Sequence, residues 1–164
     1  MAPKMLALYP EANYTSAGLR FSDIAQSIEI TGRNLAVTNA LGNNTWNAEN
    51  MILPATHFTD QAYYWYAATK MSASSLTSAP IKSTLGAANV PTAQIMQKYL
   101  LSFVITGDPN TLWANDTGKT YWPKYNERAA ASPTVMLFNT NNMTLGGDDL
   151  ATGKSLFWNK ALWY

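Results

Sequence analysis

The sequence predicts an α/β fold, because segments with helical periodicity alternate with a segment that has the character of a strand. A buried helical stripe covers residues 23–40, a strand candidate covers residues 45–53, and a strongly apolar helix covers residues 92–105. Alternation of this kind is typical of architectures in which helices pack on a sheet. The chain has 164 residues, which is enough to bury a core.

The first helix is expected to begin at Asp23, an N-cap residue with Gln26 three residues later. Its buried stripe repeats at spacings of four, three and four residues: Ile24, Ile28, Thr31 and Leu35. Gly32 interrupts the pattern, since glycine costs about 1 kcal/mol relative to alanine inside a helix. The helix is expected to end near Ala40, before a polar turn that contains Gly42.

The strand candidate at residues 45–53 ends at Pro54, because proline lacks the N–H that a sheet requires. Met51 and Leu53 would lie on one face, and the other face would carry Trp46, Ala48, Asn50 and Ile52. A short aromatic helix is expected at residues 61–69, and a long surface loop or lid at residues 71–91. Beyond the helix at residues 92–105, residues 112–164 alternate turn clusters with short aromatic pieces.

Composition excludes two classes of partner. The net charge is +1 and 13% of residues are charged, so no basic face predicts a nucleic-acid partner. No apolar stretch approaches the about 20 residues that span a membrane. Six Trp and nine Tyr supply a large aromatic surface, which must be covered within this chain or by another part of a larger protein.

Four Asn-x-Thr triplets point to a secreted glycoprotein, although a chain without cysteine would ordinarily suggest the cytosol. The acceptor asparagines would be Asn13, Asn43, Asn115 and Asn142. The first ten residues do not form a signal peptide, because their apolar stretch is short and Pro10 ends it. We therefore expect an export signal upstream of Met1.

His57 is the only histidine and the strongest candidate for a catalytic residue. It follows the expected strand at its carboxyl end, where open α/β sheets build their sites, and histidine is the commonest general base. The alternative is a loop histidine with a structural role. Asp60 could orient the imidazole, although a cap for the next helix is the simpler role, and residues 63–66 could line a pocket or pack in the core.

The partners that a catalytic histidine requires are not found in the sequence. No Gly-x-Ser-x-Gly elbow occurs, and no cysteine replaces the serine. No phosphate loop or dinucleotide fingerprint occurs, and one histidine without cysteine makes a zinc site improbable. The sequence therefore predicts neither a metal nor an organic cofactor.

Three separated segments resemble the C-terminal part of the type-B carboxylesterase/lipase family, the cholinesterase-like branch of the α/β-hydrolases, in a fungal style. They are residues 22–30 (SDIAQSIEI), residues 53–60 (LPATHFTD), and residues 99–110 (YLLSFVITGDPN) followed by residues 122–125 (WPKY). The succession of helix, Gly-Asp-Pro-Asn and Trp-Pro-x-Tyr is the most specific of these. The resemblance implies that residues 1–164 are a partial domain: the last strand or strands of an α/β-hydrolase sheet, with closing helices and long loops.

The resemblance also implies a chemistry. His57 would hold the family's catalytic-histidine position, taking a proton from an elbow serine and returning one to the alcohol that leaves the ester. The serine and the acid precede the histidine in this family, so both would lie upstream of Met1, and these residues alone would be inactive. The whole protein would hydrolyse a small-molecule or lipid ester without a cofactor.

Two departures from the family pattern keep a second hypothesis open. Phe58 stands where the family usually has glycine, and Gly32 where relatives often have a cysteine. The alternative to an esterase is a secreted, non-catalytic interaction protein, because cholinesterase-like folds also serve as binding domains.

Overall fold

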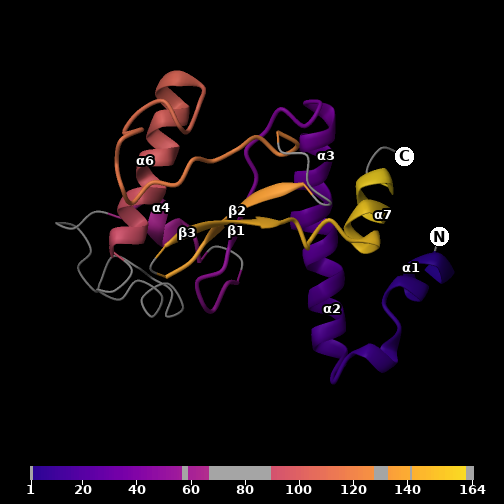
Figure 1. The fold of residues 1–164 in the computed structure, drawn as a ribbon. Helices are drawn as coiled ribbons and strands as arrows, with labels where there is room; N and C mark the ends of the chain where they lie inside the picture. The colour runs from indigo at the N-terminus through magenta and orange to yellow at the C-terminus, as the bar shows by residue number, and fades with distance from the viewer. Residues whose placement is uncertain (1, 57–58, 67–89, 128–132, 141, 162–164) are drawn as a thin grey trace. The chain divides into compact units, whose positions relative to one another are not determined.

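The computed structural model describes residues 2–56, 59–66, 90–127, 133–140 and 142–161. The chain divides into two compact units, shown in Figure 1. Unit 1 comprises Met1–Thr45 and Asp148–Tyr164, and unit 2 comprises Trp46–Gly147. Helices and a small three-stranded mixed sheet occur together, so the expected α/β class holds in its broad sense. None of the described helices is both long and apolar enough to cross a membrane.

Unit 1 is helical. It contains α1 (Ala2–Leu8), a 3₁₀ turn (Glu11–Asn13), α2 (Ala17–Gln26), a π-helical turn (Ser27–Thr31), α3 (Gly32–Ala40) and α7 (Gly153–Ala161). Helix α2, the π turn and α3 follow one another without a break, so the chain is helical from residue 17 to residue 40.

The start of this helix differs from the sequence-based expectation. Ser16 is the N-cap residue, and its side chain accepts a hydrogen bond from the backbone N–H of Leu19 at 3.2 Å. Asp23 lies within the helix and accepts hydrogen bonds from the Tyr14 hydroxyl at 2.6 Å and from the Lys154 ammonium at 2.5 Å. Serine and aspartate are both good N-cap residues. Here Ser16 caps the helix, and Asp23 pairs with the Lys154 ammonium on α7.

Gly32 has a packing role that the sequence pattern does not reveal. A Cβ atom at this position would lie 2.7 Å from the Ser27 carbonyl oxygen and 3.0 Å from Cβ of Trp158 on α7. Both separations are shorter than an ordinary van der Waals contact. Glycine is therefore present because α7 and the π turn leave no space for a side chain.

Unit 2 is built around the sheet. Its strands are β1 (Ala48–Asn50), β2 (Thr134–Phe138) and β3 (Met143–Gly147), in the order β1-β2-β3. Strand β1 pairs with β2 in parallel, with Ala48 opposite Met136, and β2 pairs with β3 as an antiparallel hairpin. The regular part of β1 is three residues long, much shorter than the expected strand at residues 45–53.

Helix α6 (Val90–Thr106) agrees closely with the expected helix at residues 92–105. It ends at Gly107, which has φ of +78° and donates its backbone N–H to the Phe103 carbonyl oxygen at 2.8 Å. Glycine is favoured in this left-handed cap because it has no Cβ. The short helix α4 covers Gln61–Tyr64. Trp65 is its C-cap, and Trp65 and Tyr66 are not helical, so the helix ends earlier there than the expected range of residues 61–69; residues 67–69 lie outside the described residues. Most of the expected loop at residues 71–91 also lies outside the described residues, and residues 90 and 91 belong to α6.

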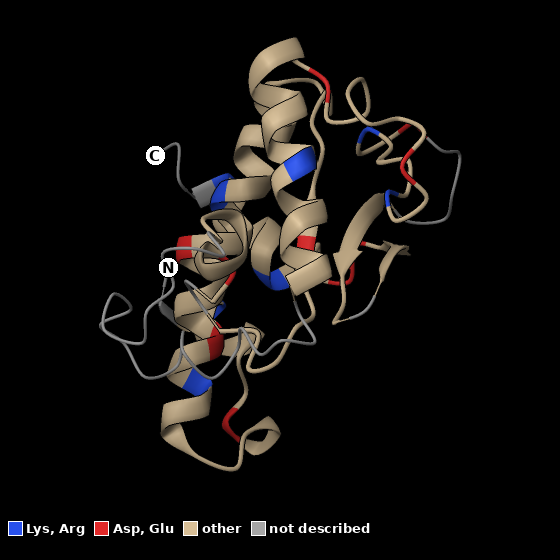
Figure 2. Ribbon diagram, turned by 90° about the vertical axis from the view of Figure 1, so that its left-hand side faces the viewer, with Lys and Arg blue, Asp and Glu red and all other residues tan. Residues whose placement is uncertain are grey.

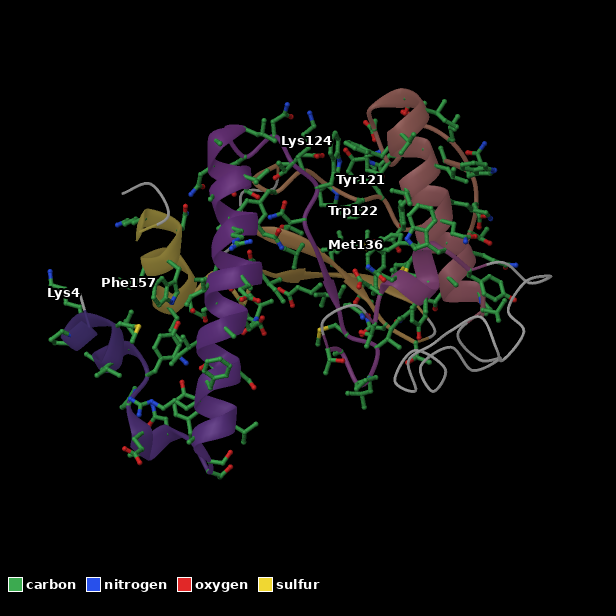
Figure 3. The ribbon with its side chains drawn as sticks, turned by 180° about the vertical axis from the view of Figure 1, so that it is seen from behind. Lys4, Tyr121, Trp122, Lys124, Met136 and Phe157 are labelled. Atoms are coloured by element: carbon green, nitrogen blue, oxygen red, sulfur yellow. The ribbon has the colours of Figure 1, made fainter. Side chains whose placement is uncertain are left out.

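Aromatic side chains form the centre of unit 2. The rings of Tyr99, Trp122 and Phe138 pack with centroids 5.3 to 6.3 Å apart, and two of the three pairs meet edge to face. Tyr63 and Met136 are fully buried in the same cluster. Figure 3 labels Trp122 and Met136. Much of the aromatic surface noted in the sequence is thus covered within this unit.

Candidate functional site

His57 and Phe58 lie outside the described residues, but the chain on both sides of them is described. Strand β1 leads into this segment, and α4 follows it. The backbone N–H of Met51, directly after β1, donates to the Phe138 carbonyl oxygen of β2 at 2.9 Å. The segment that contains His57 therefore follows the carboxyl end of a strand, as the sequence predicted, and this strand is paired in parallel with β2.

Asn50, the last residue of β1, bonds to both ends of the segment. Its side-chain oxygen accepts from the backbone N–H of Ile52 at 3.1 Å, and its amide group donates to Oγ1 of Thr59 at 3.1 Å. The sequence pattern predicts for Asn50 only a position on one face of the strand. An asparagine in a strand is unusual enough to have signalled this second role.

Thr59 closes the segment on its other side. Its side chain is buried, and Oγ1 donates to the Thr56 carbonyl oxygen at 2.7 Å while the backbone N–H donates to the same oxygen at 3.1 Å. Thr56 and Thr59 are the described neighbours of His57 and Phe58 in the chain. Three hydrogen bonds of Thr59 thus fix Thr56 and Thr59 relative to each other and to Asn50.

Asp60 begins α4 and does not cap it with its side chain. Its backbone carbonyl oxygen accepts from the N–H groups of Tyr63 and Tyr64 at 3.0 and 3.2 Å, and its carboxylate makes no capping hydrogen bond. Asp60 thus has the expected N-cap position, but the expected cap by its side chain is not formed. Burial raises the pKa of the Tyr64 hydroxyl well above its ordinary value, and the negative charge of Asp60 raises it further.

The aromatic cluster at residues 63–66 serves mainly to pack α4. Tyr63 is fully buried, and Tyr64 meets Phe138 edge to face with centroids 6.4 Å apart. Gln97 of α6 donates to the carbonyl oxygens of Tyr64 and Tyr66 at 3.2 and 2.5 Å, which satisfies the end of α4. Trp65 differs from its neighbours, because it is 76% exposed.

The Gly-Asp-Pro-Asn segment is joined to the Trp-Pro segment by Asn110. The Asn110 side chain donates to the Trp122 carbonyl oxygen at 2.9 Å and accepts the Trp122 backbone N–H at 2.8 Å. Its amide nitrogen and its backbone N–H both donate to a carboxylate oxygen of Asp108, at 3.0 and 2.7 Å. Ser102 of α6 donates to the Asp108 carbonyl oxygen at 2.7 Å. These contacts form one network, in which both polar atoms of the Asn110 side chain and its backbone N–H are hydrogen-bonded.

This network reaches the strand that leads to His57. The indole N–H of Trp122 donates to the Asn47 carbonyl oxygen at 3.0 Å, and the backbone N–H of Met136 donates to the same oxygen at 3.0 Å. Asn47 directly precedes β1. The Asn47 carbonyl oxygen thus joins the Trp122 side chain and β2 to the start of the strand that leads to residues 53–60, and Asn110 joins Trp122 to the Gly-Asp-Pro-Asn segment.

The four acceptor asparagines all lie in turns or at the ends of elements. Asn13 ends the 3₁₀ turn, Asn43 is in the turn after α3, Asn115 is in the turn after α6, and Asn142 is in the connection between β2 and β3. No acceptor lies within a strand or a long helix. The other two residues of the last triplet, Met143 and Thr144, belong to β3.

Charges are interspersed in both units, as Figure 2 shows, without a run of one sign. In the part of the chain that the structure describes, no three His, Cys, Asp or Glu side chains are placed to hold a metal ion. One charged cluster joins Asp23, Tyr14 and Lys154 in unit 1. There, burial opposes ionisation of Asp23, but hydrogen bonds from Lys154 and Tyr14 hold the pKa of its carboxyl below the ordinary value.

Comparison of the chain with protein-family models, with curated proteins and with solved structures finds no match. The function must therefore be argued from the residues and their geometry.

Proposed function

We propose that this chain is a C-terminal portion of a carboxylic ester hydrolase of the carboxylesterase/lipase type, with His57 as its general acid and base. The observation that carries the proposal is the histidine segment at residues 53–60, which resembles the family's histidine loop. Its described flanks support this reading, because the segment follows a parallel strand and is tied at both ends by Asn50 and Thr59. A general base has to be held in this way to meet its substrate.

The chemistry would be acyl transfer to a serine. His57 would accept the serine proton as the hydroxyl attacks the ester carbonyl, and it would then give a proton to the departing alcohol. Water would hydrolyse the acyl-serine with His57 again acting as the base. The substrate would be a small-molecule or lipid ester, and the reaction needs no metal or organic cofactor.

Exposed apolar surface supports the further proposal that these residues are part of a larger domain. Val104 and Ile105, near the end of α6, are 71% and 66% exposed, and Leu53, next to the histidine segment, is 81% exposed. Val104 and Ile105 are adjacent in the chain, and contiguous exposed apolar surface is typical of a face that another part of a protein covers. We propose that the serine elbow and the acid belong to that other part.

The first experiment measures hydrolysis of a short-chain p-nitrophenyl ester by the 164-residue chain and by its His57→Ala variant. We expect no specific turnover, since losing a triad member costs several powers of ten in rate. Turnover by the chain that the His57→Ala change abolishes would show that a nucleophile lies within these residues, and would refute the proposal of an inactive portion.

The second experiment treats the native protein, as isolated from its source, with a serine-directed organophosphonate probe. Covalent labelling that heat denaturation abolishes is expected of an ester hydrolase, because only an activated serine reacts. Peptide mapping of the labelled protein would then locate the serine. A native protein that contains His57 and takes no label would contradict the hydrolase proposal.

That second outcome would favour the other candidate, a secreted interaction protein with an esterase-like fold. The specific observation in favour of this candidate is Phe58, a bulky residue directly after the histidine. A Phe58→Gly variant of the native protein separates the two, since an enzyme would keep or gain activity when the ring is removed.

A further inference from the structure

The four acceptor triplets differ in which of their side chains are exposed. In the triplets that begin at Asn13, Asn115 and Asn142, the asparagine and the threonine are exposed and the middle residue is turned inward. The triplet that begins at Asn43 has the opposite pattern, with a half-buried asparagine, an exposed middle residue and a half-buried threonine. Since an attached sugar has to remain in water, this difference separates three triplets from the fourth.

In each of the three outward triplets the middle residue anchors the chain. The Tyr14 hydroxyl donates to Asp23, Asp116 pairs with Lys98 and accepts the Gly118 N–H at 2.9 Å, and Met143 is buried in the core cluster. With the middle residue fixed, its two neighbours project to solvent on the other side. The exposed Thr144 hydroxyl accepts a hydrogen bond from the Asn139 side chain at 3.0 Å, so burial, and not a hydrogen bond of the threonine alone, separates the triplets.

Asn43 is held in a tight turn. It has φ of +62°, and its backbone N–H donates to the Thr38 carbonyl oxygen at 2.8 Å. The Thr45 hydroxyl, two residues later, donates to Oγ1 of Thr38 at 3.3 Å, and Thr38 itself is buried. A sugar attached to Asn43 would have to fit into this half-buried turn, next to the side chains that pack at the end of α3.

We propose that Asn13, Asn115 and Asn142 carry N-linked glycans and that Asn43 does not. In the transfer, the side-chain nitrogen of asparagine forms a bond to C1 of the first sugar of a lipid-linked oligosaccharide. The bond from C1 to the lipid diphosphate breaks, the lipid diphosphate leaves, and one amide proton passes to solvent. This inference requires passage through a secretory pathway and does not depend on the proposed ester hydrolysis.

Trypsin places each acceptor on a separate peptide, which makes the test direct. Cleavage after lysine and arginine yields residues 5–20, 34–70, 99–119 and 129–154, each with one of the four triplets. The native protein is treated with an amidase that removes N-glycans and converts each modified asparagine to aspartate, and the peptides are then sequenced by mass spectrometry. Omitting the amidase controls for spontaneous deamidation.

We expect aspartate at positions 13, 115 and 142 after treatment, and asparagine at position 43. Asparagine at any of the first three positions overturns the assignment of that residue, and aspartate at position 43 overturns the argument from exposure. A second test secretes the chain from a eukaryotic host with a signal peptide in front of Met1. There, Thr15→Ala, Thr117→Ala and Thr144→Ala should each remove one glycan by gel mobility, whereas Thr45→Ala should remove none; any other pattern contradicts the proposal.

Discussion

Replacing Gly32 with alanine is expected to destabilise unit 1, although alanine normally stabilises a helix. In an open helix the change gains about 1 kcal/mol. At Gly32 the new methyl group would lie 2.7 Å from the Ser27 carbonyl oxygen and 3.0 Å from Cβ of Trp158. Overpacking of this kind costs about 1–3 kcal/mol. The balance is a loss of up to about 2 kcal/mol.

Gly18 provides a matched control within the same helical segment. It lies in α2, and a Cβ atom there would meet only Oγ of Ser16, at 3.8 Å. Gly18→Ala therefore adds helix propensity without a clash, and the helix should become more stable by up to about 1 kcal/mol. The two variants make the same chemical change, so a difference in sign between them isolates the effect of packing.

Hydrogen exchange measured by mass spectrometry suits this comparison, because peptides from residues 17–40 report on the helix separately from unit 2. A loss of about 2 kcal/mol would speed exchange of the most protected amides roughly 30-fold in Gly32→Ala. Gly18→Ala should slow exchange or leave it unchanged. If exchange in Gly32→Ala is as slow as in Gly18→Ala, the methyl group fits between the π turn and α7 without a clash, and the proposed overpacking is wrong.

Three further outcomes are expected. Thr59→Val should cost about 1–3 kcal/mol of stability for each polar partner left unsatisfied. It should also shift the imidazole NMR signals, which come from His57 alone. Thr111→Val, at an exposed position, should do neither. Asn110→Ala should lower the urea midpoint of unit 2, whereas Asn126→Ala, an exposed change, should not. The pKa of the Asp23 carboxyl is lower in the folded state than in the unfolded state. The stabilising contribution of Asp23 is therefore present above the unfolded pKa of about 3.9 and is lost as the pH falls through the folded pKa. Acid unfolding curves of the native chain and of Asp23→Asn should thus converge at low pH.

Sequence patterns predicted the elements that depend on local signals. The helix at residues 92–105 was found within two residues at its start and one at its end, because a long apolar run precedes a glycine cap and a proline. The sequence also predicts the strand before His57, but the predicted range of residues 45–53 is longer than β1. Only Ala48–Asn50 pairs in register with β2, although the Asn47 carbonyl oxygen and the Met51 N–H also bond to β2, and Met51 is half exposed. Strand length is set by pairing with β2, which lies more than 80 residues later.

Contacts between distant segments were not predictable. Asp23 has the sequence signature of a helix cap, and only the position of Lys154 on α7 makes it an ion-pair residue instead. The sequence marks Gly32 as an unfavourable helix residue, whereas the structure favours glycine there because Trp158 approaches the backbone closely. The hydrogen bonds of Asn50 and Asn110 join residues nine and twelve positions apart in the chain, beyond the reach of helical or strand periodicity.

The network around Asn110 bears on how the esterase resemblance should be weighed. The side chains of Asp108, Asn110 and Trp122 are all used in hydrogen bonds within unit 2, and together they support the Asn47 carbonyl group before β1. Those contacts stabilise unit 2 whether or not the protein hydrolyses esters. The Gly-Asp-Pro-Asn and Trp-Pro motifs are therefore evidence for architecture, and His57 is the residue on which the catalytic proposal depends. For that reason, the covalent probe on the native protein tests function more sharply than any variant of the motif residues.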